Sequence, residues 1–296
     1  MKLRDVPLLL CAWAIATSAV AQDTGTLAKI RKDGVVTLGV RESSVPFSYY
    51  DDQQKVVGYS ADLCGIVVNA IKDRLHMPNL TVKEMPTTSQ NRLPLIINGT
   101  VDLECGSTTN NTDREKQVAF SDTTFVIGTR LLVARNSGIK DFPDLASKTV
   151  VTTAGTTSEK ILREMNYKNN MHMNVISAKD HAESFLTLQS GRAAAFMMDD
   201  ALLYGQLAKS SDASAYEVVG KPQSYEAYGL VMRKDDPEFK ALVDQTLVAT
   251  MKSGEAAKLY DRWFMKPIPP KGINLNFPMT AEVKDHFANP NDKPYQ

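Results

Sequence analysis

Three arginines stand where a folded chain could use them to bind an anion. Arg41 follows an apolar run at 35–40, Arg92 follows a second run at 80–85, and Arg114 follows a string of hydroxyl and amide residues. A planar guanidinium group suits a two-point grip on a carboxylate. Asp199 follows another apolar run and would supply one anion. Three cations and one anion leave a net charge of +2, which matches an α-amino dicarboxylate with two carboxylates and one ammonium.

Polar side chains accompany these four at the same places in the chain. They are Ser89, Ser107, Thr109, Thr156, Thr157 and His181. Hydroxyl groups at such positions most often cap helices, and a single histidine more often lies on the surface or packs in the core. Three stretches fit the capping-box pattern or its Asp variant, namely Thr112-x-x-Glu115, Thr156-x-x-Glu159 and Asp180-x-x-Glu183. A binding site is therefore argued from the convergence of these groups, because each alone has an ordinary structural explanation.

The elements that would position these residues alternate between strand and helix. The first series has strands at 35–40, 80–85 and 101–105, and the second has strands at 149–154, 173–178 and 193–198. Helical spacing follows each strand, as at 61–75 and 91–99. Such alternation predicts parallel sheets with helices on both faces, and ligands of these folds bind beyond the carboxyl ends of the strands.

Two long β-type runs, at 125–135 and 227–234, flank the second series. They predict that the chain leaves one lobe and later returns, so that two strands join two α/β lobes. We expect residues 22–128 with 231–296 to form the first lobe and residues 129–230 to form the second. The proline-rich C-terminal segment would wrap the first lobe. Phe47, Tyr49 and Tyr50 would form an aromatic wall for the ligand's carbon chain, and Tyr49 and Tyr50 could equally pack in the core.

Composition and targeting signals place the chain among exported globular proteins. The 296 residues carry 34 basic and 34 acidic side chains, which gives no bulk field for nucleic acid. Residues 1–21 resemble a cleavable signal peptide, with Lys2 and Arg4 before an apolar core and Ala19-Val20-Ala21 as the cleavage site. A short membrane anchor is the less favoured alternative. Cys64 and Cys105 are then compatible with one disulfide or with two buried thiols.

Several long stretches resemble the glutamate/aspartate-binding periplasmic proteins of ABC importers. They are RESSVPFSYYDDQQKVVGYSADL from Arg41, TTSQNRLPLIINGTVDLECGSTTNNTDREKQVAFSDT from Thr87, GTTSEK from Gly155, SAKDHAESF from Ser177, SGRAAAFMMDDALL from Ser190 and GKPQSYEAYGLVMRKDDPEFK from Gly220. The resemblance covers nearly all of the chain after residue 21. It implies a type II periplasmic binding protein fold, in which two lobes close on the ligand about a hinge like a venus flytrap.

The resemblance also implies a role for each candidate residue. Arg114 would grip the α-carboxylate with help from Ser107 and Thr109, and Asp199 would pair with the α-ammonium. Thr156 and Thr157 would offer contacts at a helix N-terminus. The side-chain carboxylate would lie among the remaining candidates, Arg41, Ser89, Arg92 and His181.

We therefore expect a periplasmic binding protein that delivers glutamate or aspartate to a membrane permease. It would be a monomer without enzymatic activity, cofactor or metal. An exported dehydratase of the same fold, acting on arogenate or prephenate with His181 or Glu104 as general acid, is the main alternative. A sensing module for a membrane kinase is a third. The sequence does not rank glutamate against aspartate, since a methylene group is worth only about 1–3 kcal/mol in a pocket.

Overall fold

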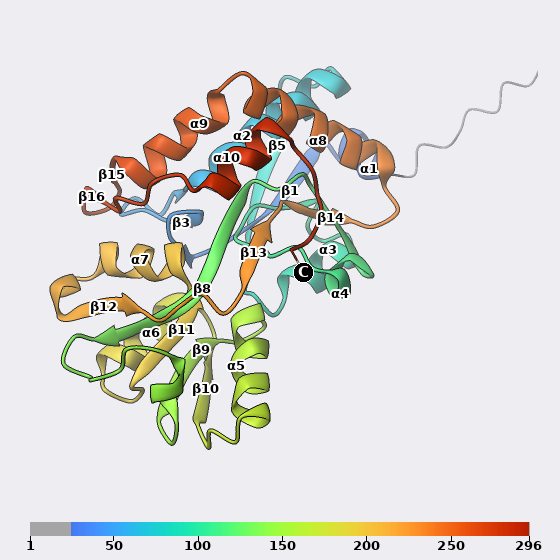
Figure 1. Ribbon diagram of the computed structural model, residues 1–296. Helices are drawn as coiled ribbons and strands as arrows, with labels where there is room; N and C mark the ends of the chain where they lie inside the picture. The colour runs from blue at the N-terminus through green and yellow to red at the C-terminus, as the bar shows by residue number, and fades with distance from the viewer. Residues whose placement is uncertain (1–24, 296) are drawn as a thin grey trace, which may run out of the picture.

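The computed structural model describes residues 25–295, so the predicted signal peptide lies outside the described residues. The described chain forms two α/β lobes, each built around one sheet, with β8 and β13 running between them (Figure 1). We call the body around β1 the first lobe and the body around β9 the second lobe.

The first lobe contains a mixed sheet of five strands in the order β5-β1-β6-β14-β7. Its strands are β1 (Val35–Val40), β5 (Thr81–Pro86), β6 (Leu103–Glu104), β7 (Val118–Phe120) and β14 (Val231–Arg233). The central strand β1 pairs in parallel with β5 and β6, as the strand–helix alternation predicts. β14 pairs antiparallel with β6 and β7. The strands of the predicted alternation thus pair in parallel, whereas β14, which enters the sheet after the chain has returned from the second lobe, runs antiparallel.

Helices cover this sheet and carry much of the first lobe's core. They are α1 (Thr26–Asp33), α2 (Tyr59–Leu75), α3 (Arg92–Ile97), α4 (Thr112–Glu115), α8 (Pro237–Lys252), α9 (Glu255–Tyr260) and α10 (Ala281–Ala288). Along α2, Leu63, Val67, Ile71 and Leu75 recur every four residues and are all buried. This spacing places them on one helix face, and burying that face against the sheet stabilises the helix. Of the described helices, none has the length and apolar character to cross a membrane.

The second lobe is built on the order β10-β9-β11-β8-β12, with β13 paired to the other end of β8. Its strands are β8 (Phe125–Ala134), β9 (Thr149–Thr153), β10 (Asn174–Ala178), β11 (Ala195–Asp199), β12 (Tyr216–Val219) and β13 (Tyr225–Tyr228), and its α-helices are α5 (Thr157–Lys168), α6 (His181–Gln189) and α7 (Asp200–Lys209). β9 pairs in parallel with β10 and β11. Their carboxyl ends face the first lobe, because Gly155, just after β9, accepts a hydrogen bond from Arg114.

Two antiparallel strands connect the lobes. β8 and β13 pair from Gly128 opposite Tyr225 to Phe125 opposite Tyr228. The β-type run predicted at 227–234 is divided by Gly229 and Leu230 into the end of β13 and all of β14, which belong to different sheets. The chain thus changes lobe within a few residues.

Short elements complete the fold. They are β2 (Ser43–Ser44), β3 (Ser48–Tyr50), β4 (Val56–Val57), β15 (Pro267–Ile268), β16 (Ile273–Asn274), the 3₁₀ turns η1 (Phe142–Leu145) and η2 (Ala213–Ala215), and the π-helical turn η3 (Asp261–Met265). The C-terminal segment runs back over the first lobe. The backbone N–H of Phe277 donates to Phe264 at 3.1 Å, and that of Thr123 donates to Asn291 at 2.9 Å.

An aromatic cluster packs where the two connecting strands leave the first lobe. The fully buried Phe47 contacts Phe125 edge-to-face at a centroid distance of 4.9 Å and Tyr228 at 5.2 Å. Tyr49 is also buried and donates through its hydroxyl to the carbonyl of Pro269 at 2.7 Å. The structure therefore places both residues in the core, and Phe47 packs directly on the two strands that join the lobes.

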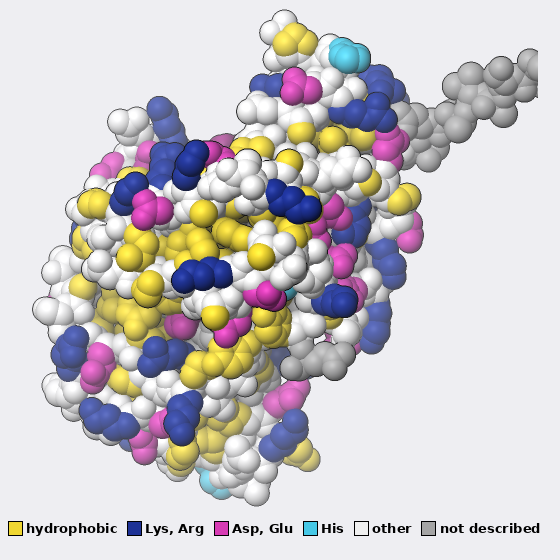
Figure 2. Space-filling model, turned by 45° about the horizontal axis from the view of Figure 1, so that its top comes forward, with side chains coloured by type: hydrophobic (Ala, Val, Ile, Leu, Met, Phe, Trp, Pro, Cys, Tyr) yellow, Lys and Arg dark blue, Asp and Glu magenta, His cyan; other side chains and the backbone are white. Residues whose placement is uncertain are grey.

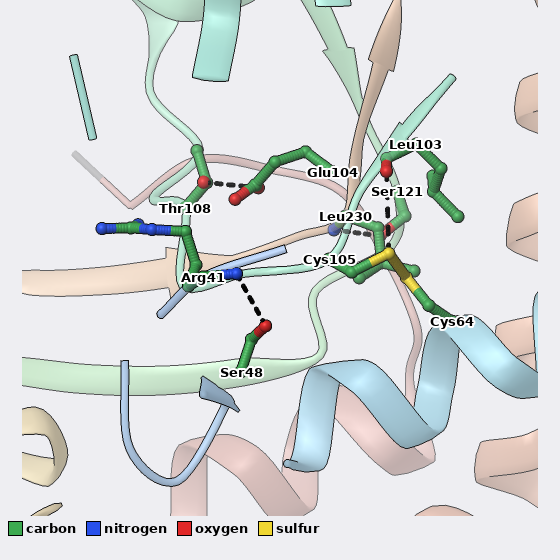
Figure 3. The surroundings of a disulfide bond; sticks show 9 residues. All are labelled: Arg41, Ser48, Cys64, Leu103, Glu104, Cys105, Thr108, Ser121 and Leu230. Atoms are coloured by element: carbon green, nitrogen blue, oxygen red, sulfur yellow. Dashed lines mark hydrogen bonds between the residues drawn. A yellow bond between two sulfur atoms is a disulfide. The ribbon is translucent and has the colours of Figure 1, made fainter. Parts of the chain in front are cut away.

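Cys64 of α2 and Cys105, which follows β6, form a disulfide bond with a Cα–Cα distance of 6.1 Å (Figure 3). This decides between the two states that the sequence leaves open. The bond fixes α2 to the end of β6, immediately beside the segment that continues into Ser107 and Thr109. Elsewhere on the surface, basic and acidic side chains are interspersed over the face in Figure 2, as the balanced composition leads one to expect.

Candidate ligand-binding site

The predicted site residues lie at the carboxyl ends of strands where the two lobes face each other. Those that are buried are Arg41, Ser89, Arg92, Ser107, Thr109, His181 and Asp199. Arg114, Thr156 and Thr157 are partly buried. Charges from both lobes act on one another, since Arg41 and Arg92 lower the pKa of His181 from across the cleft. The expected convergence of these groups is therefore present in the fold.

Arg41 is held by its neighbours in the first lobe and keeps part of its guanidinium free. Nε donates to the carbonyl of Thr87 at 3.1 Å and Nη2 donates to Ser89 Oγ at 2.9 Å. Nη1 is buried and lacks a hydrogen-bond partner among the described residues. Burial and the adjacent positive charge of Arg92 lower the pKa of Arg41 to about 10. A carboxylate beside it would supply the missing acceptor and the missing negative charge.

Arg92 repeats this pattern at the first turn of α3. Its Nη1 donates to the carbonyl of Ser107 at 3.0 Å, while its buried Nε has no partner within the described part of the chain. Burial lowers the pKa of this guanidinium, and the carboxylate of Glu104 partly offsets the effect. Ser107 Oγ is likewise buried and, within residues 25–295, makes no hydrogen bond.

Glu104 is a fully buried acid of β6 that faces the cleft. Figure 3 shows its side chain on the opposite side of the strand from Cys105, directed toward Thr108. Thr108 Oγ1 donates to its Oε2 at 2.7 Å, while Oε1 has no partner among the described residues. A Cβ at Gly106 would lie 2.2 Å from that Oε1 and 2.9 Å from Cγ of Arg41. Glycine is therefore required here so that both charged side chains fit beside the backbone.

His181 begins α6 and approaches from the second lobe. Ser184 Oγ donates to the carbonyl of Asp180 at 2.8 Å, so Thr153, 2.8 Å away, donates its hydroxyl proton to Ser184. Nδ1 of His181 lies 2.8 Å from the same Thr153 oxygen and must then donate to it. Burial and the two arginines lower the pKa of His181 well below its usual value, so the ring is neutral. Its buried Nε2 is consequently unprotonated and has no partner within the described chain.

Arg114 lies in the single turn of α4 and reaches both lobes. Its Nη1 donates to the carbonyl of Thr109 at 2.8 Å and its Nη2 to that of Gly155 at 3.4 Å. The helix is capped by Asn111, whose Oδ1 accepts from the backbone N–H of Arg114 at 2.9 Å. The predicted cap at Thr112 is therefore wrong. Asparagine is the better N-cap residue and precedes Thr112 directly, so the helix begins one residue earlier than predicted.

The two threonines at the start of α5 have different environments. Thr156 is the N-cap residue that its sequence pattern predicts: Oγ1 accepts from the backbone N–H of Glu159 at 3.1 Å and donates to the carbonyl of Thr153 at 2.7 Å. Thr157 Oγ1 instead donates to Glu226 Oε2 at 2.6 Å. The hydroxyl group of Thr156 thus serves the helix, and only that of Thr157 points to another charged group.

Asp199 ends β11 and accepts hydrogen bonds on both oxygens. Oδ1 accepts from Ser158 Oγ at 3.1 Å and from Thr129 Oγ1 at 3.3 Å, and Oδ2 accepts from the hydroxyl of Tyr228. Burial and the negative charge of Glu226 raise the pKa of Asp199 far above its usual range. A cationic group beside these two carboxylates would stabilise their ionised forms.

The buried charges differ from those that the sequence predicts. Glu104 and Glu226 join Asp199 at the cleft, opposite Arg41, Arg92 and Arg114. The charge count made from the sequence therefore omits two carboxylates. Glu104 stands out in the sequence as an acid within a buried apolar run, whereas Glu226 is hidden in the second connecting strand.

Several buried polar atoms at the cleft have no hydrogen-bond partner among the described residues. They are Arg41 Nη1, Ser44 Oγ, Arg92 Nε, Glu104 Oε1, Ser107 Oγ and His181 Nε2. Folded proteins leave few such atoms unpaired, and each costs free energy when buried alone. The set points to a polar, charged ligand. Among residues 25–295, groups of three or more His, Cys, Asp or Glu side chains able to hold a metal ion are absent.

A family model described as bacterial extracellular solute-binding proteins, family 3, matches residues 36–266. The chain belongs to this family.

Curated relatives of this family 3 solute-binding protein cover almost all of it. It is 60% identical over 268 residues to the glutamate/aspartate import solute-binding protein of Salmonella typhimurium, covering 90% of this chain and 89% of the relative. It is 55% identical over 299 residues to the Escherichia coli protein of the same description, covering 99% of each.

A solved structure of a related protein shares the fold. The ancestral amino acid-binding protein AncCDT-1, described as a precursor of cyclohexadienyl dehydratase, matches with a TM-score of 0.70 and 29% identity, covering 80% of this chain and 99% of that one. The fold is thus the two-lobe type II periplasmic binding protein fold, as predicted, with β8 and β13 as its hinge strands.

Proposed function

We propose that this family 3 solute-binding protein captures L-glutamate or L-aspartate between its lobes and delivers it to the membrane permease of an ABC importer. The observation that carries the proposal is the set of unpaired buried groups on Arg41, Arg92, Ser107 and His181. Both arginines lie close enough to His181 to lower its pKa. A dicarboxylate would provide acceptors to both arginines at once. The printed descriptions of the Salmonella and E. coli relatives support the same ligand class.

The proposed ligand lies with its side-chain carboxylate between Arg41, Ser89, Arg92 and His181. Nε2 of His181 can donate to that carboxylate only when the ring is doubly protonated. A negative charge close to both arginines would offset their effect on the ring and favour that protonation. The α end of the ligand then lies toward Arg114 and Asp199, on the side of the hinge strands.

We assign residues 22–128 with 231–296 to the first lobe and residues 129–230 to the second. Ligand contacts to both lobes would stabilise the closed arrangement, and water exclusion would strengthen each charged contact. The protein would act in the periplasm as a monomer, after removal of residues 1–21.

A binding role is favoured over a dehydratase that acts on arogenate or prephenate. The buried acids Asp199 and Glu226 suit a ligand with an ammonium group, which prephenate lacks. The curated relatives are described as import solute-binding proteins, which supports the binding role.

Thermal unfolding with and without ligand tests the proposal. A ligand that binds only the folded state raises stability by about 2.7 kcal/mol at a concentration 100 times its dissociation constant. Glutamate and aspartate should raise the melting temperature in proportion to the logarithm of their concentration. An unchanged melting temperature with both, or turnover of arogenate or prephenate by the purified protein, would contradict the proposal.

A further inference from the structure

Glu226 is a buried acid in the middle of the second hinge strand, and nothing in the sequence pattern marks it for a role in binding. Its side chain is only 4% exposed. Oε2 accepts from Thr109 Oγ1 of the first lobe and, at 2.6 Å, from Thr157 Oγ1 of the second. Oε1 accepts from Ser224 Oγ at 3.1 Å. One carboxylate oxygen of the hinge strand therefore accepts a hydrogen bond from a hydroxyl group of each lobe.

These two hydrogen bonds fix the direction of both threonine hydroxyl groups. A hydroxyl group carries one proton and two acceptor lone pairs. Thr109 and Thr157 each direct that proton to Glu226, so each can present only lone pairs to the cleft. They can accept from an ammonium group, but they cannot donate to a carboxylate.

We propose that Glu226 is a positioning residue that orients the hydroxyl groups of Thr109 and Thr157 as acceptors, so that this end of the cleft selects ligands with an α-ammonium group. The inference deepens the proposed amino-acid binding function and rests on it. The role that the family resemblance implies for Thr109 is then reversed, because its hydroxyl group would contact the ammonium rather than the α-carboxylate. The α-carboxylate is left to Arg114.

A second carboxylate reinforces this selection. Asp199 and Glu226 lie beside two neighbouring hydroxyl groups, those of Thr129 and Ser224, whose oxygens are 2.7 Å apart. Thr129 also contacts Asp199, and Ser224 contacts Glu226. Two acids therefore lie at the α end of the cleft, whereas Arg41 and Arg92 lie toward His181. A ligand with its ammonium near the acids and its distal carboxylate near the arginines matches both ends.

The test compares glutamate with 2-oxoglutarate, which has both carboxylates but no ammonium group. In Glu226→Gln the amide nitrogen can donate to the two threonine oxygens, which turns their protons toward the cleft. The ratio of the glutamate association constant to that of 2-oxoglutarate, measured by calorimetry at up to millimolar ligand, should fall at least tenfold. Glu164→Gln is the matched control. Glu164 lines the same surface pocket as Glu226 but forms an ion pair with Lys168. That control should leave the ratio unchanged.

Threonine variants keep the inference testable should the Glu226 variant fold poorly. Thr109→Val and Thr157→Val each remove one acceptor. Each should therefore weaken the binding of glutamate and leave the binding of 2-oxoglutarate unchanged. Adding Glu226→Gln to the double valine variant should not change the ratio further, because the hydroxyl groups through which Glu226 acts are gone. Equal losses for both ligands in the valine variants, or an unchanged ratio in folded Glu226→Gln, would overturn the inference. Wild-type protein that binds neither ligand would instead contradict the proposed function.

Discussion

Arg114 and Gly155 meet across the cleft, where Nη2 of the arginine donates to the glycine carbonyl at 3.4 Å. Gly155 has a left-handed backbone with φ of +78°, and a Cβ there would lie 2.8 Å from the backbone of Gln90. The lobes are thus in contact where Arg114 stands, and glycine leaves the space for that contact. An arginine in this place can hold an α-carboxylate while bridging both lobes.

Arg114→Ala should abolish binding of every amino acid, because it removes the proposed partner of the carboxylate that all of them share. Loss of one partner of a buried charge pair costs about 2–5 kcal/mol, on the order of 100-fold or more in affinity. Calorimetric titration with glutamate, aspartate and glutamine would measure the loss. Arg163→Ala, which removes an exposed arginine of α5, is the control and should bind normally. Wild-type affinity in Arg114→Ala would refute the assignment.

Arg92→Ala should weaken the binding of glutamate far more than the binding of glutamine. Arg92 is proposed to pair with the side-chain carboxylate, and glutamine carries a neutral amide in that place. The measurement is the change in the glutamate-to-glutamine affinity ratio between wild type and variant. Arg74→Ala, on the exposed end of α2, provides the matched loss of one positive charge. Equal losses for glutamate and glutamine would count against a role at the side-chain end.

Much of the site follows from the sequence because the polar residues stand directly after strands of a doubly covered sheet. That rule places Arg41, Arg92 and Asp199 at the cleft without any knowledge of distances. The rule does not identify Glu226, because this residue lies inside a connecting strand. Which groups its side chain meets depends on how the two lobes are arranged about the hinge. The orientation of hydroxyl groups also escapes the sequence, since it depends on which acceptor each proton finds in the folded chain.

The fold shows the same division between local and long-range information. Helix α2 and the strands before Arg41 and Asp199 follow from periodicity, which is a local property. The division of the run at 227–234 into strands of different sheets follows from pairing with β8 and β7, which are about a hundred residues away in the chain. The cap at Asn111 is a local feature that the capping-box pattern one residue later obscures.

His181→Gln should change how stability depends on pH in the absence of ligand. The folded protein holds the pKa of His181 well below 6.5, so only the unfolded chain takes up this proton as pH falls below 6.5. This destabilises the folded wild type at low pH and has no effect above pH 7. The free energy of unfolding of the variant relative to wild type should therefore rise as pH falls from 7.5 to 5.0, by at most about 2 kcal/mol. Urea unfolding measures it, and parallel pH profiles would show that the ring titrates normally.

The disulfide between Cys64 and Cys105 should contribute measurably to stability. It closes a loop with a sequence separation of 41 residues, for which the loss of unfolded-chain entropy predicts about 4 kcal/mol. Dithiothreitol should lower the melting temperature of wild type and leave that of Cys64→Ala/Cys105→Ala unchanged. A wild-type melting temperature insensitive to full reduction would show that the cross-link adds nothing.

The cleft is proposed to recognise both carboxylates and the ammonium group of an acidic amino acid. Calorimetric titration of the mature chain with glutamate, aspartate, glutamine and 2-oxoglutarate tests this proposal most directly. We expect one-to-one binding in which the association constant of glutamate or aspartate exceeds those of both glutamine and 2-oxoglutarate by at least tenfold. Tighter binding of glutamine would show that Arg41 and Arg92 do not receive a carboxylate, and equal binding of 2-oxoglutarate would show that Asp199 and Glu226 do not receive an ammonium group.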